Sequence, residues 1–313
     1  MAASGNTLRS IKRLSPAKLN LILKVEEKKR SDGYHSLTTL FERINLADEM
    51  EFREERSGIN ILCHSRGVPR DEENLAYRAA ELLKKTCKIK SGVSIRLKKN
   101  IPVAAGLGGG SSNAASTLLG LNRLWRLGLH RKSLLNLSAQ LGADVSFFVL
   151  ESPFAIGTGR GDTLQPISFK GTFKHLLVYP AKRTSLKGKT AAIYQGFDRK
   201  IRQKKSQERF PEPNLTPLSL DVKILHRFVK NRNAIGLRSL LFNSLEQVVF
   251  RHFRRARDIK EALLDSGCLA SLVSGSGPTV FGILNEENAM LHHRIKPPFK
   301  GWQFCLSKTL HSL

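Results

Sequence analysis

The sequence has 313 residues, enough for two domains at roughly 150 residues each. Hydrophobic residues make up 41% of it and charged residues 25%, so a disordered or fibrous chain is excluded. Lysine and arginine outnumber aspartate and glutamate by 52 to 26, and the resulting net charge of +26 supports an anionic partner without identifying it, with a solvated basic surface as the alternative.

Alternating apolar residues predict a strand over residues 14–25. Because successive side chains point to opposite faces of a strand, Lys18 and Asn20 share one face, opposite the leucines. Helical spacing is clearest over residues 111–127, and a shorter helix over 131–141 ends at Gly142. The other elements predicted in this half are strands over residues 44–52, 58–63 and 93–98 and a helix over 74–86.

The second half begins with strands between residues 154 and 179, followed by a charged, proline-containing stretch, 198–217, that is typical of a loop. Strands and helices do not alternate regularly along the chain, which predicts the α+β class. We expect two domains, at residues 1–160 and 161–313. The remaining predicted elements are helices over residues 221–230, 234–241 and 245–265 and strands over 268–274 and 279–284.

Targeting signals are not evident in the sequence. No apolar run approaches the roughly 18 residues that cross a bilayer, and residues 1–13 lack the apolar core of a secretory signal. We therefore expect no membrane contact. Basic runs at 199–209 and 251–257 contain a single aromatic residue, too few for stacking on bases, so we do not expect a nucleic-acid partner. We also expect a cytoplasmic protein, because scattered cysteines are typical of unpaired thiols in a reducing cytosol. The four cysteines are Cys63, Cys87, Cys268 and Cys305.

The most informative pattern is a run of glycine and serine at the start of the strongest predicted helix. Glycines let the backbone approach an anion closely, and the first turn of a helix presents unpaired N–H groups at the positive end of its dipole. This arrangement predicts a phosphate-binding loop, although a turn that only connects a strand to a helix is the alternative. The run consists of Gly108, Gly109, Gly110, Ser111 and Ser112.

Two common phosphate-binding loops are excluded. A Walker loop requires a lysine directly after its last glycine, whereas Ser111 follows Gly110. The triplet at residues 188–190 also fails, because Arg183 stands where the first glycine of that motif belongs. A dinucleotide-binding fingerprint would need a third glycine at the position of Ser111.

The segment from Pro102 to Ser112 resembles the P-x-x-x-G-L-G-G-G-S-S motif of the GHMP kinase superfamily, which includes galactokinase, homoserine kinase and mevalonate kinase. Stretches at residues 15–21, 30–37, 141–145 and 274–281 are similar, in the same order, to motifs of one of its families. That family phosphorylates a cytidine diphosphate polyol in the non-mevalonate pathway to isoprenoids. The resemblance runs from residue 14 to residue 281 and so covers most of the chain.

The resemblance implies a two-domain α+β fold, with an N-terminal domain like ribosomal protein S5 domain 2 and a ferredoxin-like C-terminal domain. It also implies ATP-dependent phosphorylation of the 2-hydroxyl of the polyol, with Mg²⁺ expected and its ligands unknown. The expected partners are therefore small molecules, ATP and the cytidine diphosphate polyol. The residues implied to bind ATP are Pro102, Val103, Ala104, Ala105, Gly106, Leu107, Gly108, Gly109, Gly110, Ser111 and Ser112.

Two residues are implied to be catalytic. Phosphoryl transfer needs a group that accepts the proton of the attacking hydroxyl, and the resemblance gives this role to Asp144. Lys18 would pair with this aspartate and polarise the hydroxyl. From the residues alone, Asp144 could instead cap the following helix, and Lys18 could be a solvated strand residue.

The substrate end is implied to involve Tyr34 and His35, which would stack on the cytosine and bond its polar edge. Tyr194 would form a second aromatic wall, and Asn20 would hold the substrate or Lys18. The turn that contains Gly275 and Ser276 would lie near the phosphates or the substrate, or it could be an ordinary tight turn between strands.

Two other functions remain open from the sequence. The first is a GHMP kinase for a different small alcohol, against which Tyr34 and His35 argue because they suit a cytidine. The second is an RNA-binding protein built on an S5-like domain, which the net charge of +26 suggests. The second function leaves the glycine-rich segment and Asp144 unexplained.

Overall fold

The structure is a computed structural model of the chain that describes residues 9–182, 188–204, 221–285 and 300–312. The chain forms two compact units, each assembled from several segments. Unit 1 consists of Met1–Ala17, Leu46–Val103 and Gly109–Glu151, and unit 2 of Lys18–Asn45, Ala104–Gly108 and Ser152–Leu313. Two long strands, β1 (Ser10–Lys29) and β2 (His35–Glu55), contribute residues to both units.

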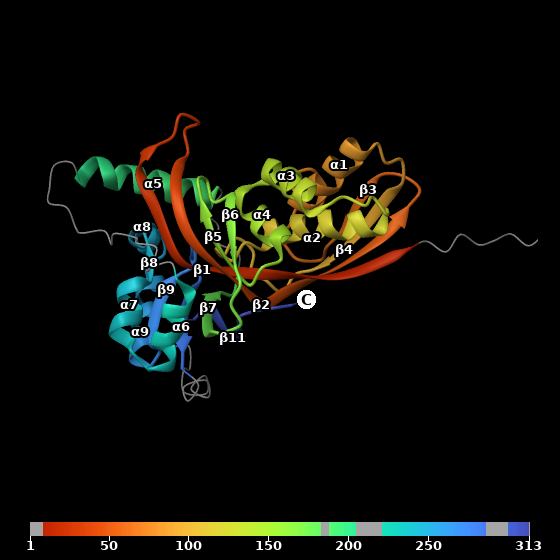
Figure 1. Ribbon diagram of the computed structural model, residues 1–313. Coiled ribbons are helices and arrows are strands. Elements are labelled where there is room, and N and C mark those ends of the chain that lie inside the picture. Colours follow the sequence, from red (N-terminus) through yellow and green to blue (C-terminus); the bar gives the residue numbers. More distant parts are fainter. Residues whose placement is uncertain (1–8, 183–187, 205–220, 286–299, 313) are drawn as a thin grey trace, which may run out of the picture. The chain divides into compact units, whose positions relative to one another are not determined.

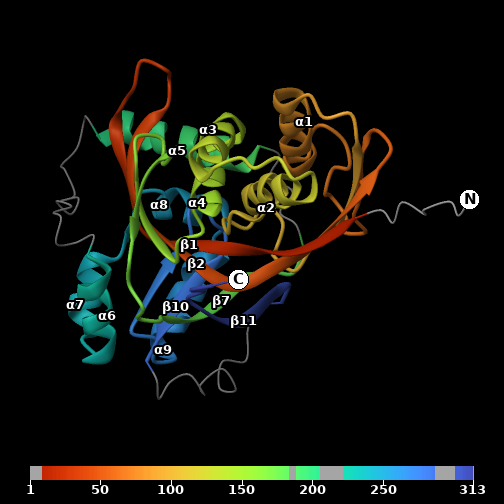
Figure 2. The same cartoon turned by 45° about the vertical axis from the view of Figure 1, so that its right-hand side comes forward.

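Unit 1 is a sheet covered by helices. Strand β4 (Gly92–Lys98) pairs antiparallel with the second half of β2 and parallel with β3 (Ile59–Leu62), so that Ile95 lies between Phe52 and Ile61. The helices lie together on one side of these strands (Figure 1, Figure 2). They are α1 (Leu75–Cys87), α2 (Gly109–Leu124), α3 (Arg131–Leu141) and α4 (Ala143–Leu150).

Two local features of the sequence fix helices α1 and α2: a capping asparagine and a glycine at a packing contact. The Asn74 side chain caps α1 by accepting a hydrogen bond from the backbone N–H of Ala76 at 2.9 Å. Helix α2 packs closely on the sheet because Gly120 has no side chain, and a Cβ there would lie 2.8 Å from the Phe52 ring. The buried core beneath the helices therefore forms around Phe52, α1 and α2.

Unit 2 contains an antiparallel sheet in the order β11 (Trp302–Lys308), β7 (Lys174–Pro180), β10 (Val280–Leu284) and β9 (Ala270–Val273). Apolar residues of the sheet form a core with those of α5 (Lys189–Lys204), α8 (Glu246–His252) and α9 (Arg255–Asp265). The first half of β2 pairs with β5 (Phe154–Thr158), and β5 pairs with β6 (Thr163–Ile167). The unit is completed by α6 (Val222–Lys230), α7 (Ala234–Leu240) and β8 (Phe242–Asn243), a short strand parallel to β1.

The α+β class predicted from the sequence is confirmed, and most predicted elements lie within a few residues of the observed ones. Two predictions were wrong. The single helix expected over residues 245–265 is two helices, because the chain leaves the helical conformation at Phe253, whose ring packs against the core. Residues 198–204 continue helix α5 instead of forming a loop, since Ile193, Phe197 and Ile201 form one apolar stripe; residues 205–217 of that stretch lie outside the described residues.

The structure also contains elements that are not among the predicted ones: α4, α5, β8 and β11. Within the described ranges, no helix is both long and apolar enough to cross a membrane. The domain boundary at residue 160 stays a prediction.

Candidate active site

The glycine-rich segment begins directly after β4 and runs into α2. Its backbone has positive φ at Ala104 (58°), Gly106 (87°) and Gly108 (71°), so the chain turns repeatedly within a few residues. A Cβ at Gly106 would lie 2.4 Å from the backbone oxygen of Ser274, so no other residue fits at this position without moving the backbone. Gly109 and Gly110 form the first turn of α2, where backbone N–H groups have no partner within the helix.

Within unit 2, residues 104–108 of this segment are held by backbone hydrogen bonds. The N–H of Lys18 donates to Leu107 O at 3.0 Å, and the N–H of Thr279 donates to Ala105 O at 3.1 Å. The Ser274 hydroxyl donates to Gly106 O at 3.1 Å. Three stretches that are far apart in the sequence, around residues 18, 106 and 275, therefore meet in unit 2.

Lys18 and Asn20 lie on the same face of β1, as the alternation predicts, and both are buried. The Lys18 ammonium donates to the Asn20 side-chain oxygen. The amide of Asn20 is itself oriented, because its nitrogen donates to the Thr39 hydroxyl at 2.8 Å and Thr39 donates to Ile22 O at 2.7 Å. A Cβ at Gly275 would lie 3.1 Å from both the Lys18 nitrogen and the Asn20 oxygen, so the turn at Gly275 lies directly against this pair.

Lys189, the first residue of α5, is a member of this site that the sequence analysis missed. Its side chain is 6% exposed, and its ammonium donates to Ser276 O at 3.0 Å, to Ser276 Oγ at 2.8 Å and to Gly277 O. Burial, together with the charge of Lys18, lowers the pKa of Lys189 to about 7. Lys189 lies four residues before Ile193 on the buried stripe of α5, but a lysine at this position gives no apolar signal by which the sequence could have revealed it.

Asp144 belongs to unit 1, in the first turn of α4. Its side chain is partly buried, and five consecutive residues after it are buried: Val145, Ser146, Phe147, Phe148 and Val149. The N-cap position of α4 is Gly142, so Asp144 does not cap this helix as the alternative interpretation required. Helix α4 is also joined to α3 by a hydrogen bond of 2.8 Å between Ser138 and Ser146.

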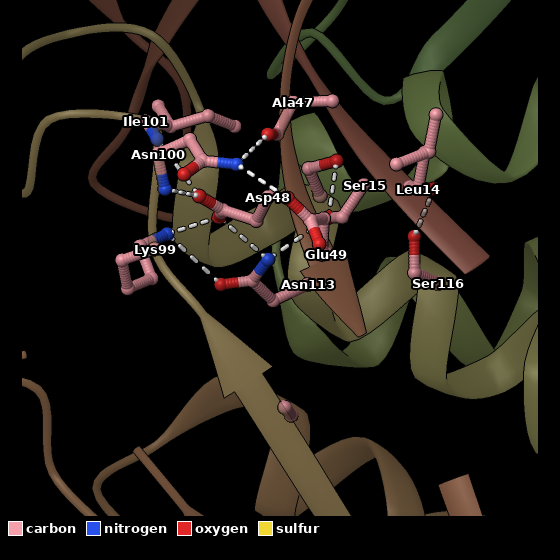
Figure 3. A network of polar contacts seen from close by, with 12 residues as sticks. Leu14, Ser15, Ala47, Asp48, Glu49, Lys99, Asn100, Ile101, Asn113 and Ser116 are labelled. Atoms are coloured by element: carbon pink, nitrogen blue, oxygen red, sulfur yellow. Dashed lines mark hydrogen bonds and ion pairs between the residues drawn. The ribbon is translucent and has the colours of Figure 1, made fainter. Parts of the chain in front are cut away.

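A buried polar network in unit 1 supports the start of α2 (Figure 3). Asp48, fully buried, accepts hydrogen bonds from the backbone N–H groups of Asn100 and Ile101, both at 2.8 Å. The same carboxylate accepts from the Asn113 amide at 2.9 Å and from the Lys99 ammonium. One carboxylate on β2 thus fixes both the backbone before Pro102 and the second turn of α2.

The serines of the motif differ in their surroundings. The Ser112 hydroxyl is buried and accepts a hydrogen bond of 2.8 Å from Ser15, which itself accepts from Asn113 at 2.9 Å. The Ser111 side chain is partly exposed. What α2 offers to an anion at its start is therefore mainly its backbone N–H groups.

The predicted substrate residues lie near the turn between β1 and β2. Tyr34 is 59% exposed, and the Arg160 guanidinium lies 4.8 Å from the centre of its ring. The buried His35 ring is roughly parallel to the Tyr194 ring, with a centroid distance of 6.2 Å and an interplanar angle of 27°. Both ring nitrogens of His35 have partners, Glu26 O and Asp198 Oδ1, each at 2.7 Å. Asp198 lies in helix α5, in a stretch for which the sequence predicts a loop.

The described part of the chain holds no group of three or more histidine, cysteine, aspartate or glutamate side chains arranged for a metal ion. Its four cysteines are free thiols. Within unit 2, the backbone of residues 104–108 and two buried lysines, Lys18 and Lys189, are groups that can bind an anion.

Comparison with known proteins identifies relatives with this organisation. Models for the GHMP kinases N terminal domain and the GHMP kinases C terminal domain match residues 74–152 and 225–290. The chain is 41% identical over 297 residues to a 4-diphosphocytidyl-2-C-methyl-D-erythritol kinase of Synechococcus sp., covering 94% of this chain and 92% of the relative. It is 41% identical over 292 residues to a protein of the same name from Bacillus cereus, covering 93% and 92%.

Solved structures lead to the same group of proteins. A crystal structure of 4-(cytidine 5'-diphospho)-2C-methyl-D-erythritol kinase matches with a TM-score of 0.73 and 32% identity, covering 95% of this chain and 99% of that chain. A homoserine kinase from Cytophaga hutchinsonii matches with a TM-score of 0.64 at 18% identity, covering 99% and 98%, which shows a shared fold.

The network around Asp48 gives a first testable prediction. In Asp48→Asn, one carboxylate oxygen becomes an NH₂ group, which cannot accept the hydrogen bonds that this oxygen accepts now. Lys99 is then left as a buried charge without its counterion. We expect the free energy of unfolding to fall by about 3 kcal/mol, measured by urea denaturation. The control is Glu49→Gln, which removes an exposed ion pair with Lys98 and should change the free energy of unfolding far less than Asp48→Asn does. Equal losses in both variants would contradict the supporting role of Asp48.

Lys189 gives a prediction about pH. The unfolded chain keeps the Lys189 proton up to its ordinary pKa of 10.5, whereas the folded chain releases it at about 7. Between these values the unfolded state binds more protons, so the wild type should gain stability as the pH rises through this range. In Lys189→Met this gain should be lost, which urea denaturation at about pH 6 and about pH 10 would detect.

The matched control for Lys189→Met is Lys223→Met, which removes an exposed lysine from the first turn of α6. Its stability should follow the same pH dependence as the wild type. If Lys189→Met also followed the wild-type dependence, Lys189 would not carry the lowered pKa.

Proposed function

The chain belongs to the 4-diphosphocytidyl-2-C-methyl-D-erythritol kinases, a family of GHMP kinases, and we propose that it transfers the γ-phosphoryl group of ATP to the 2-hydroxyl of 4-diphosphocytidyl-2-C-methyl-D-erythritol. The products are ADP and the 2-phosphate, in the non-mevalonate pathway to isoprenoid precursors. The observation that carries the proposal is the meeting, within unit 2, of the glycine-rich segment with Lys18 and the turn at Gly275.

ATP binds along the segment from Pro102 to Ser112 in this proposal. The N–H groups of Gly109 and Gly110 and the positive end of the α2 dipole face the phosphates, and the lack of side chains lets these oxygens approach the backbone. Mg²⁺ accompanies ATP and neutralises phosphate charge. In ATP chemistry this metal is usually held by phosphate oxygens, waters and one or two carboxylates, and we assign it no ligand in this chain.

Asp144 is the proposed base for the transfer. As the 2-hydroxyl oxygen attacks the γ-phosphorus, its proton passes to the Asp144 carboxylate, the new O–P bond forms, and the bond from the γ-phosphorus to ADP breaks. Lys18 is the proposed partner of this carboxylate, since a nearby cation keeps an aspartate ionised. Asn20 supports this role by accepting from the Lys18 ammonium and fixing its direction.

The cytidine end of the substrate is assigned to the β1–β2 turn. Tyr34 and Tyr194 are the proposed aromatic walls for the cytosine. His35 follows Tyr34 in the chain, and its ring is roughly parallel to that of Tyr194. Gly275 and Ser276, beside Lys18 and Lys189, would contact the polyol end or the transferred phosphoryl group. We place the protein in the cytoplasm, where free cysteines persist.

The proposed base is tested by Asp144→Asn. We expect kcat to fall by about 10²–10⁴-fold, because the amide cannot accept the hydroxyl proton, with the KM for each substrate changed little. ADP release and ³¹P NMR of the 2-phosphate measure the reaction. The control is Asp258→Asn, since Asp258 is likewise an aspartate in the first turn of a helix but is exposed on α9.

Two outcomes would overturn the proposal in different ways. Wild-type kcat in Asp144→Asn would remove the base but leave the substrate assignment intact. A wild-type protein that phosphorylates homoserine or mevalonate but not the cytidine diphosphate polyol would instead move the activity to another GHMP kinase family.

A further inference from the structure

Asp198 joins three elements of unit 2 through its carboxylate. One oxygen accepts from the Lys29 ammonium, at the end of β1, at 2.7 Å. The other lies 2.7 Å from Nε2 of His35, at the start of β2, while Asp198 itself belongs to α5. The His35 side chain is 4% exposed and that of Asp198 20%, whereas Lys29 is 47% exposed. The bond to His35 is therefore the shielded and stronger part of this network.

The partners of His35 determine the protonation of its ring. The oxygen of Glu26 that meets Nδ1 is a backbone carbonyl, which can only accept a hydrogen bond, so Nδ1 carries a proton. The Asp198 oxygen that meets Nε2 also accepts when the carboxylate is ionised, so Nε2 carries a proton as well. A histidine with protons on both nitrogens is a cation.

The surroundings of Asp198 keep it ionised. Partial burial raises its pKa, but the hydrogen bonds from Lys29 and His35 and the charges of both groups lower it by more, so the net shift is below the ordinary value. A neutral Asp198 that donates its proton to Nε2 is disfavoured, because it would keep the hydrogen bond from Lys29 but lose its ionic attraction to that ammonium.

We propose that Asp198 is a positioning residue for the substrate: it holds His35 as an imidazolium and fastens α5, with Tyr194, against the β1–β2 turn. This inference rests on the proposed function, which places the cytidine of the substrate at Tyr34, His35 and Tyr194. Both ring nitrogens of His35 are then committed to the protein. His35 would contribute a fixed positive charge next to the nucleoside diphosphate and hold Tyr194 at the stacking distance, rather than bond the base through a ring nitrogen.

The position of Tyr194 on α5 gives this role its geometric basis. Tyr194 and Asp198 are four residues apart, on one face of the helix, and both meet the His35 ring, one by stacking and one by the hydrogen bond. Phe197 contacts the same ring edge-on, with a centroid distance of 5.6 Å. Loss of the His35–Asp198 bond would therefore release the aromatic wall as well as the charge.

Steady-state kinetics of Asp198→Asn test the proposal. We expect the KM for the cytidine diphosphate polyol to rise by about tenfold, because one hydrogen bond between charged groups is lost. The kcat and the KM for ATP should stay within about twofold of the wild type. Asp198→Glu keeps the charge and should recover part of the affinity. The control is Asp265→Asn, which neutralises an exposed aspartate at the end of helix α9 and should leave all three constants unchanged.

A spectroscopic measurement tests the charge of His35 without turnover. In ¹⁵N NMR of histidine-labelled protein near neutral pH, both ring nitrogens of His35 should show shifts of protonated nitrogens, and Nε2 should lose this signature in Asp198→Asn. His35→Gln assigns the signals by their disappearance. If Asp198→Asn does not fold, the wild-type spectrum and Asp198→Glu still decide the question.

The outcomes separate this inference from the proposed function. A wild-type spectrum with one unprotonated His35 nitrogen, or an unchanged KM in Asp198→Asn with the wild type fully active, would overturn the role of Asp198 and leave the kinase intact. A wild type that does not phosphorylate the polyol would overturn the proposed function, whereas the NMR result would still show whether Asp198 holds His35 as a cation.

Discussion

The close approach of two backbone segments in unit 2 is the constraint on which the candidate site depends. Gly106 lies so near the oxygen of Ser274 that a methyl group would not fit between them. This approach places the backbone of residues 104–108 beside Lys18, and the same turn, one residue further on, places Gly275 against the Lys18 ammonium. The glycines thus do more than free the chain for turning, because they let the backbone proposed to bind the phosphates and the Lys18 ammonium lie in one small region.

That region also concentrates positive charge away from water. Lys18 and Lys189 are both buried, and the low pKa of Lys189 reports the cost of burial, to which the charge of Lys18 adds. A negatively charged ligand would reduce this cost by standing between the two cations and replacing their repulsion with attraction. The two buried lysines therefore favour a phosphorylated ligand at this particular place in unit 2. The net charge of +26 acts over the whole surface, so it could not determine where such a ligand binds.

The sequence predicted the parts of the site that depend on local pattern. Strand alternation placed Lys18 and Asn20 on one face of β1, and the run of glycines identified the start of α2. It could not predict partners that are distant in the chain, such as Asp48, which binds the backbone at Asn100 and Ile101 and the side chain of Asn113. Nothing about an aspartate in an ordinary strand indicates that it will be enclosed by donors, since that depends on how strands and helices pack.

Helix α5 shows why the remaining site residues were missed, and what they have in common. Its buried stripe, Lys189, Ile193 and Phe197, begins with a lysine, and its second half is rich in charge, so neither end has the apolar periodicity by which helices are recognised. Each residue is rotated by about 100° from the one before it, so Tyr194 and Asp198 form the row next to this stripe. The core therefore sets the orientation of the helix, and this orientation brings Lys189 to the turn at Ser276 and Asp198 to His35. Because one rigid helix carries both groups, the packing of Ile193 and Phe197 in the core fixes the spacing between the buried ammonium and the aromatic wall.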